Sequence, residues 1–461
     1  MSTINEYLET LKGKSVAVIG MGVSNMPLIR IMLKKGLNVT VCDKATREAA
    51  VERVTELEGL GAKFQLAGKY LEDLNKFDLI FRTPGLSPNS PALVSARESG
   101  SEIISEMELF FQLCPCKIIG VTGSDGKTTT TTLISEFLKE AGYTTYVGGN
   151  IGKPLLPEVD QMKPDDMVVV ELSSFQLMSM KQSANVSVFT NLSPNHLDYH
   201  HTMEEYTNAK LNIFTHQHEG DRAVFNFDND ITRELEKQAP AATMLFSRKN
   251  QLEKGVCLHG DVICLTNDEG TREVLPIADI QIPGVHNIEN YMAAIAAVDG
   301  LVSDEVVRTV AKRFTGVEHR IELVRELNGV RYYNDSIGTS PTRTMACLNS
   351  FNQKLILIAG GYDKGVPFTQ LGEGIVEKVK ALVLCGVTAP AIRKAVEEAP
   401  GFAESGLVMI ETQDLASAVK AAQDAAAEGD VVVLSPACAA FDQFKNFMER
   451  GRVFKDLVNA L

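Results

Sequence analysis

Residues 117–132 of the 461-residue chain read KIIGVTGSDGKTTTTT. The apolar start of this stretch predicts a β-strand, and the threonines after Gly126 predict a helix behind a glycine-rich turn. Backbone N–H groups of such a turn, and the N-terminus of the helix that follows, attract phosphate. Lys127 can neutralise the outer phosphates of a nucleotide, and the hydroxyl of Thr128 can bind Mg²⁺. The stretch predicts a phosphate loop. Gly123 lies closer to Gly126 than in the usual P-loop spacing, and the alternative is an ordinary glycine turn before a helix capped by threonines.

The strand expected at Met167–Glu171 is wholly apolar until its last residue. A carboxylate at that end faces the crevice into which the phosphate loop also opens, if the strands are parallel. Glu171 is therefore a candidate ligand for Mg²⁺, which prefers oxygen and keeps several waters. The alternative is a helix cap together with Ser173 and Ser174.

The stretch 191–201, NLSPNHLDYHH, follows another expected strand and contains three histidines. Zinc is one reading, but no cysteine or histidine partner has the spacing of a structural zinc site. His196 close to Glu171, serving a metal or a phosphate-rich substrate, is the competing hypothesis, with a purely structural histidine as the alternative. Spacing alone makes Lys210, in the helical stretch 203–214, a solvated surface lysine.

The length suggests three domains at about 150 residues each. Strands alternate with helical stretches at both ends of the chain, which predicts parallel sheets with crossover helices. Residues 221–282 contain short β-like runs and turns, and we expect a small antiparallel insertion there. The boundaries that we expect are 1–106, 107–316 and 317–461. The strands expected in the outer domains are 15–20, 38–43, 77–82, 330–334, 354–359, 381–385, 407–410 and 430–434.

The net charge of −14 argues against nonspecific binding to nucleic acid or to acidic membranes. The eight cysteines are scattered, and Cys114-Pro-Cys116 lacks a second pair, so reduced thiols are expected. No run approaches the roughly 18 apolar residues that span a bilayer, and the first residues are polar. We therefore expect a cytoplasmic protein with no membrane span, acting as a monomer.

Two further regions have polar residues at expected strand ends. The stretch 20–25, GMGVSN, opens like a dinucleotide fingerprint but has Asn25 at the third glycine position, and Asp43 ends the next strand. In the last domain Asp335, Lys364 and Ser435 end or follow strands, and a helix is expected to begin at Thr339-Ser340-Pro341. The aromatic residues at 441, 444 and 447 have helical spacing, which favours core positions.

Taken together, these motifs resemble the Mur ligase family, which builds the peptide of bacterial peptidoglycan. The resemblance covers essentially the whole chain. It depends on TGSDGKTTT, GGNIG (148–152), ELSSFQL (171–177), NLSPNHLDYH, the lysine at 210, HNIEN (286–290), EHR (318–320), YYNDS (332–336) and SPACAAFDQFKNF (435–447).

The family resemblance implies an α/β fold of three domains: a Rossmann-like domain for a UDP-sugar, a central P-loop domain for ATP and a doubly wound domain for an amino acid. It implies an ATP- and Mg²⁺-dependent ligase with an acyl-phosphate intermediate. ELSSFQL and SPACAAFDQFKNF are most similar to members that add D-glutamate to UDP-N-acetylmuramoyl-L-alanine.

The resemblance also implies roles for individual residues. The catalytic group would be Lys127, Glu171, His196 and Lys210, the last as a carbamate. The metal ligands would be Thr128, Glu171, His196 and Lys210. ATP would contact Gly123, Ser124, Asp125, Gly126, Lys127, Thr128, Thr129, Asn290, Arg320 and Asp335. The UDP-sugar would lie near Val23, Ser24, Asp43, Gly85 and Asn150. The amino acid would lie near Thr339, Lys364, Ala440, Phe441 and Phe447.

Two departures from the pattern concern the incoming amino acid. Ile337 stands where some D-glutamate-adding members have lysine, and Ala440 where some have serine. Backbone N–H groups at 339–342, Lys364 or Arg343 would then hold its carboxylates. The alternatives are another Mur ligase, a folate-extending glutamate ligase, which would begin directly with the ATP domain, and a P-loop NTPase without a ligase step.

Overall fold

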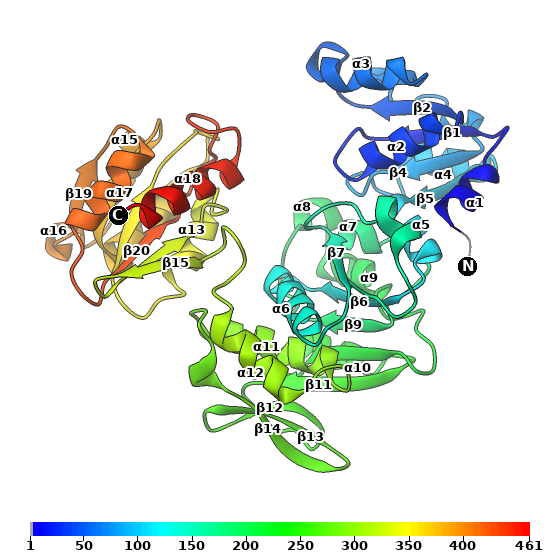
Figure 1. The fold of residues 1–461 in the computed structure, drawn as a ribbon. Helices are drawn as coiled ribbons and strands as arrows, with labels where there is room; N and C mark the ends of the chain where they lie inside the picture. The colour runs from blue at the N-terminus through cyan, green and yellow to red at the C-terminus, as the bar shows by residue number, and fades with distance from the viewer. Residues whose placement is uncertain (1–2) are drawn as a thin grey trace. The chain divides into compact units, whose positions relative to one another are not determined.

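The computed structural model describes residues 3–461. These residues form three β-sheets with helices packed against them, divided between two compact units (Figure 1). The first unit contains the residues up to Ile277 together with Glu289–Val310, and it holds the first two sheets. The second unit contains Ala278–Ile288 and Ala311–Leu461, and it holds the third sheet.

The first sheet is wholly parallel, with strand order β3-β2-β1-β4-β5. Side chains of β1 alternate between two apolar layers: Val16 and Val18 pack with residues of α2, while Ala17 and Ile19 pack with residues of α4. Burial on both faces explains why these strands are continuous apolar runs. The strands are β1 (Ser15–Ile19), β2 (Asn38–Asp43), β3 (Lys63–Leu66), β4 (Leu79–Arg82) and β5 (Glu102–Ser105), and the helices are α1 (Ile4–Glu9), α2 (Asn25–Lys34), α3 (Val51–Gly59), α4 (Pro91–Glu98) and α5 (Glu106–Leu113).

The second sheet has nine strands in the order β14-β13-β12-β11-β10-β9-β6-β8-β7. Strand β6 lies between β8 and β9, so the segments that follow these three strands leave the sheet side by side. The strands are β6 (Lys117–Thr122), β7 (Thr145–Gly149), β8 (Met167–Glu171), β9 (Val186–Phe189), β10 (Arg222–Asn226), β11 (Ala242–Ser247), β12 (Gly255–His259), β13 (Val262–Asn267) and β14 (Gly270–Pro276). The helices are α6 (Lys127–Glu140), α7 (Ser174–Leu177), α8 (Leu197–His200), α9 (Met203–Leu211), α10 (Asp230–Glu236), α11 (Val285–Val298) and α12 (Asp304–Arg313).

The expectation of a separate antiparallel insertion at 221–282 is correct only for its second half. Strands β12, β13 and β14 form an antiparallel meander, but β10 and β11 pair in parallel and extend the main sheet. Helix α10 supplies the crossover that a parallel pair requires. The sequence interpretation missed this helix because it has only seven residues, too few for a clear apolar period.

The third sheet has the order β15-β16-β20-β17-β18-β19, and only β15 is antiparallel to its neighbour. Leu355 and Leu357 of β17 pack with residues of α13, α14 and α15, whereas Ile356 and Ile358 pack with residues of α17 and α18. Helices therefore cover both faces, as predicted for a doubly wound sheet. The strands are β15 (Glu322–Leu327), β16 (Val330–Asn334), β17 (Leu355–Ala359), β18 (Val379–Leu384), β19 (Val408–Glu411) and β20 (Val431–Leu434), and the helices are α13 (Pro341–Leu348), α14 (Thr369–Lys378), α15 (Ala389–Glu397), α16 (Phe402–Ser405), α17 (Leu415–Asp424) and α18 (Phe447–Asn459).

Two expectations from composition concern the state of the cysteines and the absence of a membrane-spanning helix. All eight cysteines are unpaired in the structure, and all but Cys114 are buried. The Sγ atoms of Cys114 and Cys116 are 3.7 Å apart. Within residues 3–461, each helix is too short or too polar to cross a membrane.

Candidate active site

The phosphate loop connects β6 to α6, and its two glycines occupy positions that other residues would not tolerate. Gly123 has φ +148°, and a Cβ there would lie 2.0 Å from Thr190 Oγ1. Gly126 has φ +78°, and a Cβ there would lie 2.2 Å from Asn290 Oδ1. Both glycines are therefore required for backbone conformation and for close approach to neighbouring side chains. The unusual spacing of the loop is compatible with a built phosphate site.

The segment after β9 holds this loop from one side. Ser124 N donates to Asn191 O over 2.9 Å, and Asp125 N donates to Asn191 Oδ1 over 3.0 Å. Thr190 Oγ1 donates to Asp125 O over 2.5 Å. The loop is thus fixed before any ligand arrives, and preorganised donors are worth more than donors that must be ordered on binding.

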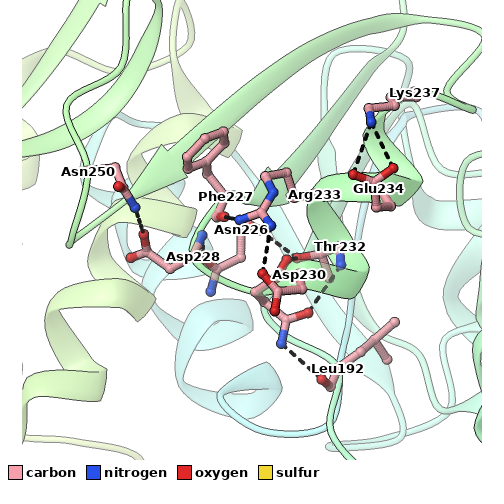
Figure 2. A network of polar contacts seen from close by, with 11 residues as sticks. Leu192, Asn226, Phe227, Asp228, Asp230, Thr232, Arg233, Glu234, Lys237 and Asn250 are labelled. Carbon is pink, nitrogen blue, oxygen red and sulfur yellow. Dashed lines mark hydrogen bonds and ion pairs between the residues drawn. The ribbon is translucent and has the colours of Figure 1, made fainter.

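A second layer of polar contacts braces residues 190–192 in turn, and Figure 2 shows part of it. Asn226 Nδ2 donates to Thr190 O over 2.8 Å, and Asn229 Nδ2 donates to Leu192 O over 2.9 Å. Thr232 Oγ1 donates to Asn226 O over 2.6 Å, which connects α10 to the end of β10. The parallel pairing of β9 with β10 brings these amides to the site. Strand β10, which the sequence analysis assigned to an antiparallel insertion, therefore supports the phosphate loop.

The first residues of α6 and the end of β8 meet beside the loop. Lys127 Nζ donates to Gly123 O over 3.0 Å and to Ser124 O over 2.8 Å. Thr128 Oγ1 donates to Glu171 Oε2 over 2.7 Å. Asn150 Nδ2 donates to Glu171 Oε1 over 2.8 Å. The amide that was predicted to contact the UDP-sugar therefore binds the carboxylate that was predicted to be a metal ligand.

Lys210 is buried, with 1% of its surface exposed, and the reading of a solvated surface lysine is wrong. Its Nζ donates to Gly123 O over 3.0 Å and to Thr122 Oγ1 over 3.1 Å, and it lies 4.9 Å from the centre of the Tyr206 ring. Burial lowers the pKa of Lys210 well below its usual range, the charge of Lys127 lowers it further, and Glu171 opposes both. The sequence interpretation missed this because the burying partners are distant in the chain, although Tyr206 lies four residues away on the same helix.

Two of the three histidines flank one aromatic ring. The Phe175 ring lies 5.1 Å from the exposed His196 ring and 5.5 Å from the His200 ring, which stacks on it. His200 is fully buried, and its Nε2 lies 2.9 Å from Ser174 Oγ. Burial lowers the pKa of His200, which favours the neutral ring. The sequence interpretation chose His196, whereas His200 is the histidine fixed by the core.

The residues predicted for the UDP-sugar, Asn150 excepted, lie around the carboxyl ends of β1, β2 and β4. Strands β1 and β4 are adjacent, and the chain leaves β1 toward one face of the sheet and β4 toward the other. A crevice is therefore expected between the loop after β1 and the loop after β4. Val23, in the first loop, is 76% exposed, and Gly85 is exposed in the second. Asp43 accepts from Met21 N over 2.7 Å and thereby holds the first loop. Asn25 Nδ2 donates to Ile19 O over 2.9 Å, a structural reason for an amide at the third glycine position.

In the second unit, Asp335 follows β16 and is almost fully buried. Ser435 Oγ donates to Asp335 Oδ2 over 2.7 Å and also contacts Thr344 Oγ1 at 2.9 Å. Burial raises the pKa of Asp335 to about 6, while the Ser435 hydrogen bond and the charge of Arg320 act in the opposite direction. Asp335 and Arg320, both predicted for the nucleotide, are therefore close together within this unit.

Three loops at the ends of β16, β17 and β20 contain the residues predicted for the amino acid. Lys364 Nζ donates to Thr339 O over 3.2 Å, and the Phe441 ring, 63% exposed, lies 5.9 Å from the Tyr362 ring. Ala440 is buried. Phe447 begins α18, whereas Phe441 and Phe444 lie in a loop of turns and bends at 440–446, so the helical spacing expected for them is wrong. The expected core position is wrong for the exposed Phe441, but Phe444 is partly buried against the core of the second unit.

The Mg²⁺ that the resemblance implies can be tested against the side chains of this site. Among residues 3–461, no group of three or more His, Cys, Asp or Glu side chains is arranged to hold a metal. The Thr128 hydroxyl and the Glu171 carboxylate nevertheless lie within 2.7 Å of each other beside the phosphate loop. Two protein oxygens beside a phosphate site fit Mg²⁺, which is usually bound by one or two carboxylates with phosphates and waters.

Family models match three consecutive parts of the chain: a MurD-like N-terminal domain at residues 14–105, the Mur ligase middle domain at 121–298 and the Mur ligase glutamate ligase domain at 319–438. An enzyme of Acetivibrio thermocellus, named UDP-N-acetylmuramoylalanine--D-glutamate ligase, is 52% identical over 99% of both chains. An enzyme of the same name from Clostridium novyi is 50% identical over 100% of this chain and 99% of its own. The chain belongs to the Mur ligase family.

Solved structures agree with this assignment at the level of the fold. The UDP-N-acetylmuramate-alanine ligase of Thermotoga maritima has a TM-score of 0.58 and 19% identity, covering 97% of this chain and 99% of its own. A pseudomurein peptide ligase of Methanothermus fervidus has a TM-score of 0.53 and 18% identity, covering 97% of this chain and 100% of its own. This Mur ligase is an ATP-dependent enzyme that forms amide bonds, as the motifs predicted.

The glycines at the two ends of α6 offer a matched test of the phosphate loop. Gly126→Ala should lower turnover by on the order of 10²-fold, because its Cβ would displace the Asn290 side chain and the loop with it. Gly142→Ala has a similar φ of +93° but open space around the Cβ, so it should cost about 1 kcal/mol of stability and leave turnover unchanged. Steady-state phosphate release from both variants measures the difference. Equal activity of the two variants would show that the close approach to Asn290 is unimportant.

Proposed function

We propose that this Mur ligase joins D-glutamate to the carboxylate of UDP-N-acetylmuramoyl-L-alanine, converting ATP to ADP and phosphate. The observation that supports this most directly is the full-length identity of about half with enzymes that carry that activity in their names. The geometry is consistent with it, since a fixed phosphate loop, a carboxylate and a buried amine converge in the first unit.

The reaction proceeds in two steps. The substrate carboxylate attacks the γ-phosphorus of ATP, giving an acyl phosphate and ADP. The amine of D-glutamate then attacks the acyl carbon, and the tetrahedral intermediate expels phosphate. Phosphoryl transfer depends mainly on positioning and charge neutralisation. The N–H groups of residues 127–129 and the Lys127 ammonium supply both at the start of α6.

The protein groups that would hold Mg²⁺ are Thr128, Glu171, His196 and the carbamate of Lys210. When bound, the ion neutralises charge on the transferring phosphoryl group. Carbamate formation requires a neutral amine, and the burial of Lys210 favours that form. Asn150 holds the Glu171 carboxylate from the side opposite Thr128, so we assign it a role in orienting that group in addition to the predicted sugar contact.

The UDP-sugar is proposed to lie between the loops after β1 and β4, against Val23, Ser24 and Gly85, with Asp43 holding the first loop in place. In the second unit, D-glutamate is proposed to lie near Thr339, Lys364, Ala440, Phe441 and Phe447. Lys364 is well placed for a carboxylate, because its ammonium lies 3.2 Å from the carbonyl oxygen of Thr339, another residue proposed to contact the amino acid. The nucleotide contacts of Asn290, Arg320 and Asp335, action as a monomer and action in the cytoplasm stay predictions.

Phosphate release by the purified protein should require UDP-N-acetylmuramoyl-L-alanine and D-glutamate together with ATP. L-Glutamate and D-aspartate should be used far less well, by roughly 10⁴-fold in favourable cases, because they would leave buried donors unpaired. A panel of amino acids, each assayed with and without the UDP-sugar, measures this. Equal use of L-glutamate or of a basic amino acid would assign the protein to another branch, and ATP turnover without either substrate would indicate a simple NTPase.

Lys127→Ala should lower kcat by roughly 10²–10³-fold, the loss typical of a group that stabilises charge in the transition state. Lys139→Ala is the matched control, because that lysine lies exposed on the same helix and contacts only Glu136. Saturating ATP and a thermal melt of each variant separate lost catalysis from lost folding. More than half of the wild-type kcat in Lys127→Ala would contradict the assignment.

Lys210 should carry a carbamate in the active enzyme. Protein equilibrated with ¹³C-labelled bicarbonate should give a carbamate carbonyl signal in ¹³C NMR, and Lys210→Ala should lack it. That variant should be inactive, and a short carboxylic acid that enters the vacated space should restore part of its activity, since it supplies the missing oxygen ligands. A fully active Lys210→Ala variant, or wild-type enzyme without the signal, would contradict this prediction.

A further inference from the structure

Arg82 ends β4 and is one of the most deeply buried large side chains of the protein, with 1% of its surface exposed. Arginine is almost never buried to this extent without specific partners. Burial lowers the pKa of Arg82, and the nearby Glu108 carboxylate opposes that effect. The partners of Arg82 belong to two segments of the first unit, residues 83–86 and residues 175–179, and the second segment begins 93 residues after Arg82.

On one side, the guanidinium holds the loop that follows β4. Arg82 Nη1 donates to Thr83 O over 3.2 Å, to Pro84 O over 3.1 Å and to Leu86 O over 2.7 Å. These carbonyls enclose Gly85, one of the residues proposed to contact the UDP-sugar. The conformation of this loop therefore depends on a donor that lies behind it.

On the other side, the same guanidinium holds α7. Arg82 Nη2 donates to Phe175 O over 3.1 Å and to Ser179 Oγ over 2.9 Å. Ser179 Oγ donates onward to Glu108 Oε2 over 3.1 Å, and that carboxylate also accepts from Ser105 N over 2.9 Å. The positive charge of Arg82 is thus compensated within a closed hydrogen-bond network.

Helix α7 is close to the chemistry at its N-terminal end. It begins three residues after Glu171, and Ser174 contacts the buried His200. The Phe175 ring lies between the rings of His196, Tyr199 and His200. One side chain therefore connects the loop beside Gly85 with the helix that supports the histidine segment.

We propose that Arg82 is a positioning residue that fixes the loop after β4, which contains Gly85, to helix α7. The bound UDP-sugar then presents its carboxylate at the phosphate loop. This inference rests on the proposed function, because it requires Gly85 to contact that substrate. The phosphate loop itself is held by residues 190–193 and not by Arg82. The loss of Arg82 should therefore act mainly on the sugar substrate and its delivery, with little effect on ATP binding.

The geometry also explains why arginine is required. Five acceptors from two segments surround one planar group, and an ammonium has only three donors that radiate from a single atom. Arg82→Lys retains the charge and loses part of the contacts, whereas Arg82→Met loses all of them. Arg97→Met is the matched control, since Arg97 is an exposed arginine on helix α4, which packs against the same sheet, and its guanidinium donates to Pro88 O over 3.1 Å.

The experiment measures KM for each substrate and kcat in the three variants, together with calorimetric binding of the UDP-sugar. Arg82→Met and Arg82→Lys should raise KM and Kd for the UDP-sugar by roughly tenfold or more and lower kcat, with KM for ATP changed by less than about twofold. Arg97→Met should match wild type in every constant. Parallel increases in KM for ATP and for the UDP-sugar would indicate a general structural defect and overturn the proposal.

Two further measurements keep the test decisive. If Arg82→Met does not fold, Arg82→Lys and Ser179→Ala test the proposal, because Ser179→Ala removes a single hydroxyl from the network. An unchanged KM for the UDP-sugar in both variants would refute the role of Arg82.

The wild-type control separates this inference from the proposed function. No turnover of the UDP-sugar by wild type would refute the proposed function, whereas active wild type with unaffected Arg82 variants would refute this inference alone.

Discussion

The buried amino group of Lys210 beneath the phosphate loop is the contact on which the first unit depends. An ammonium is costly to bury, and here the charge of Lys127 increases that cost while the charge of Glu171 reduces it. The amine is nevertheless held by Gly123 O and Thr122 Oγ1 at the end of the central strand. It therefore fixes helix α9 to the loop while keeping a group of unusual pKa beside the proposed site of phosphoryl transfer, as is common for functional residues.

Sheet topology then determines which side chains can meet that group. Strands β8, β6 and β9 are neighbours, so Glu171, the phosphate loop and residues 190–193 leave the sheet at one edge. The same rule places the loops after β1 and β4 together, and the loops after β16, β20 and β17 together. Each proposed ligand is thus expected at the carboxyl ends of parallel strands, where the helix N-termini also point.

The sequence predicted the features that local patterns determine. The phosphate loop, the apolar strands of all three sheets and the helix that begins at Pro341 follow from short stretches of residues. It did not predict the burial of Lys210, the fixed position of His200 or the network around Arg82, because each depends on partners more than 20 residues away. Family motifs predicted a function for Lys210 where spacing indicated a surface residue.

Both units contain a buried arginine that donates to irregular loops, and the phosphate loop suggests why. A loop that turns its N–H groups toward a ligand must turn carbonyls away from it, and buried carbonyls need donors. Lys127 and Lys210 both donate to Gly123 O, Arg82 serves the loop after β4, and Arg450 donates to the carbonyls of Ser336, Cys438 and Ala439. Burial lowers the pKa of Arg450 to about 10, so it stays charged at neutral pH. A guanidinium accepts no hydrogen bonds and donates up to five, which suits it to a cluster of inward carbonyls. The requirement for exposed N–H groups at each ligand site therefore creates the requirement for a buried cation behind it.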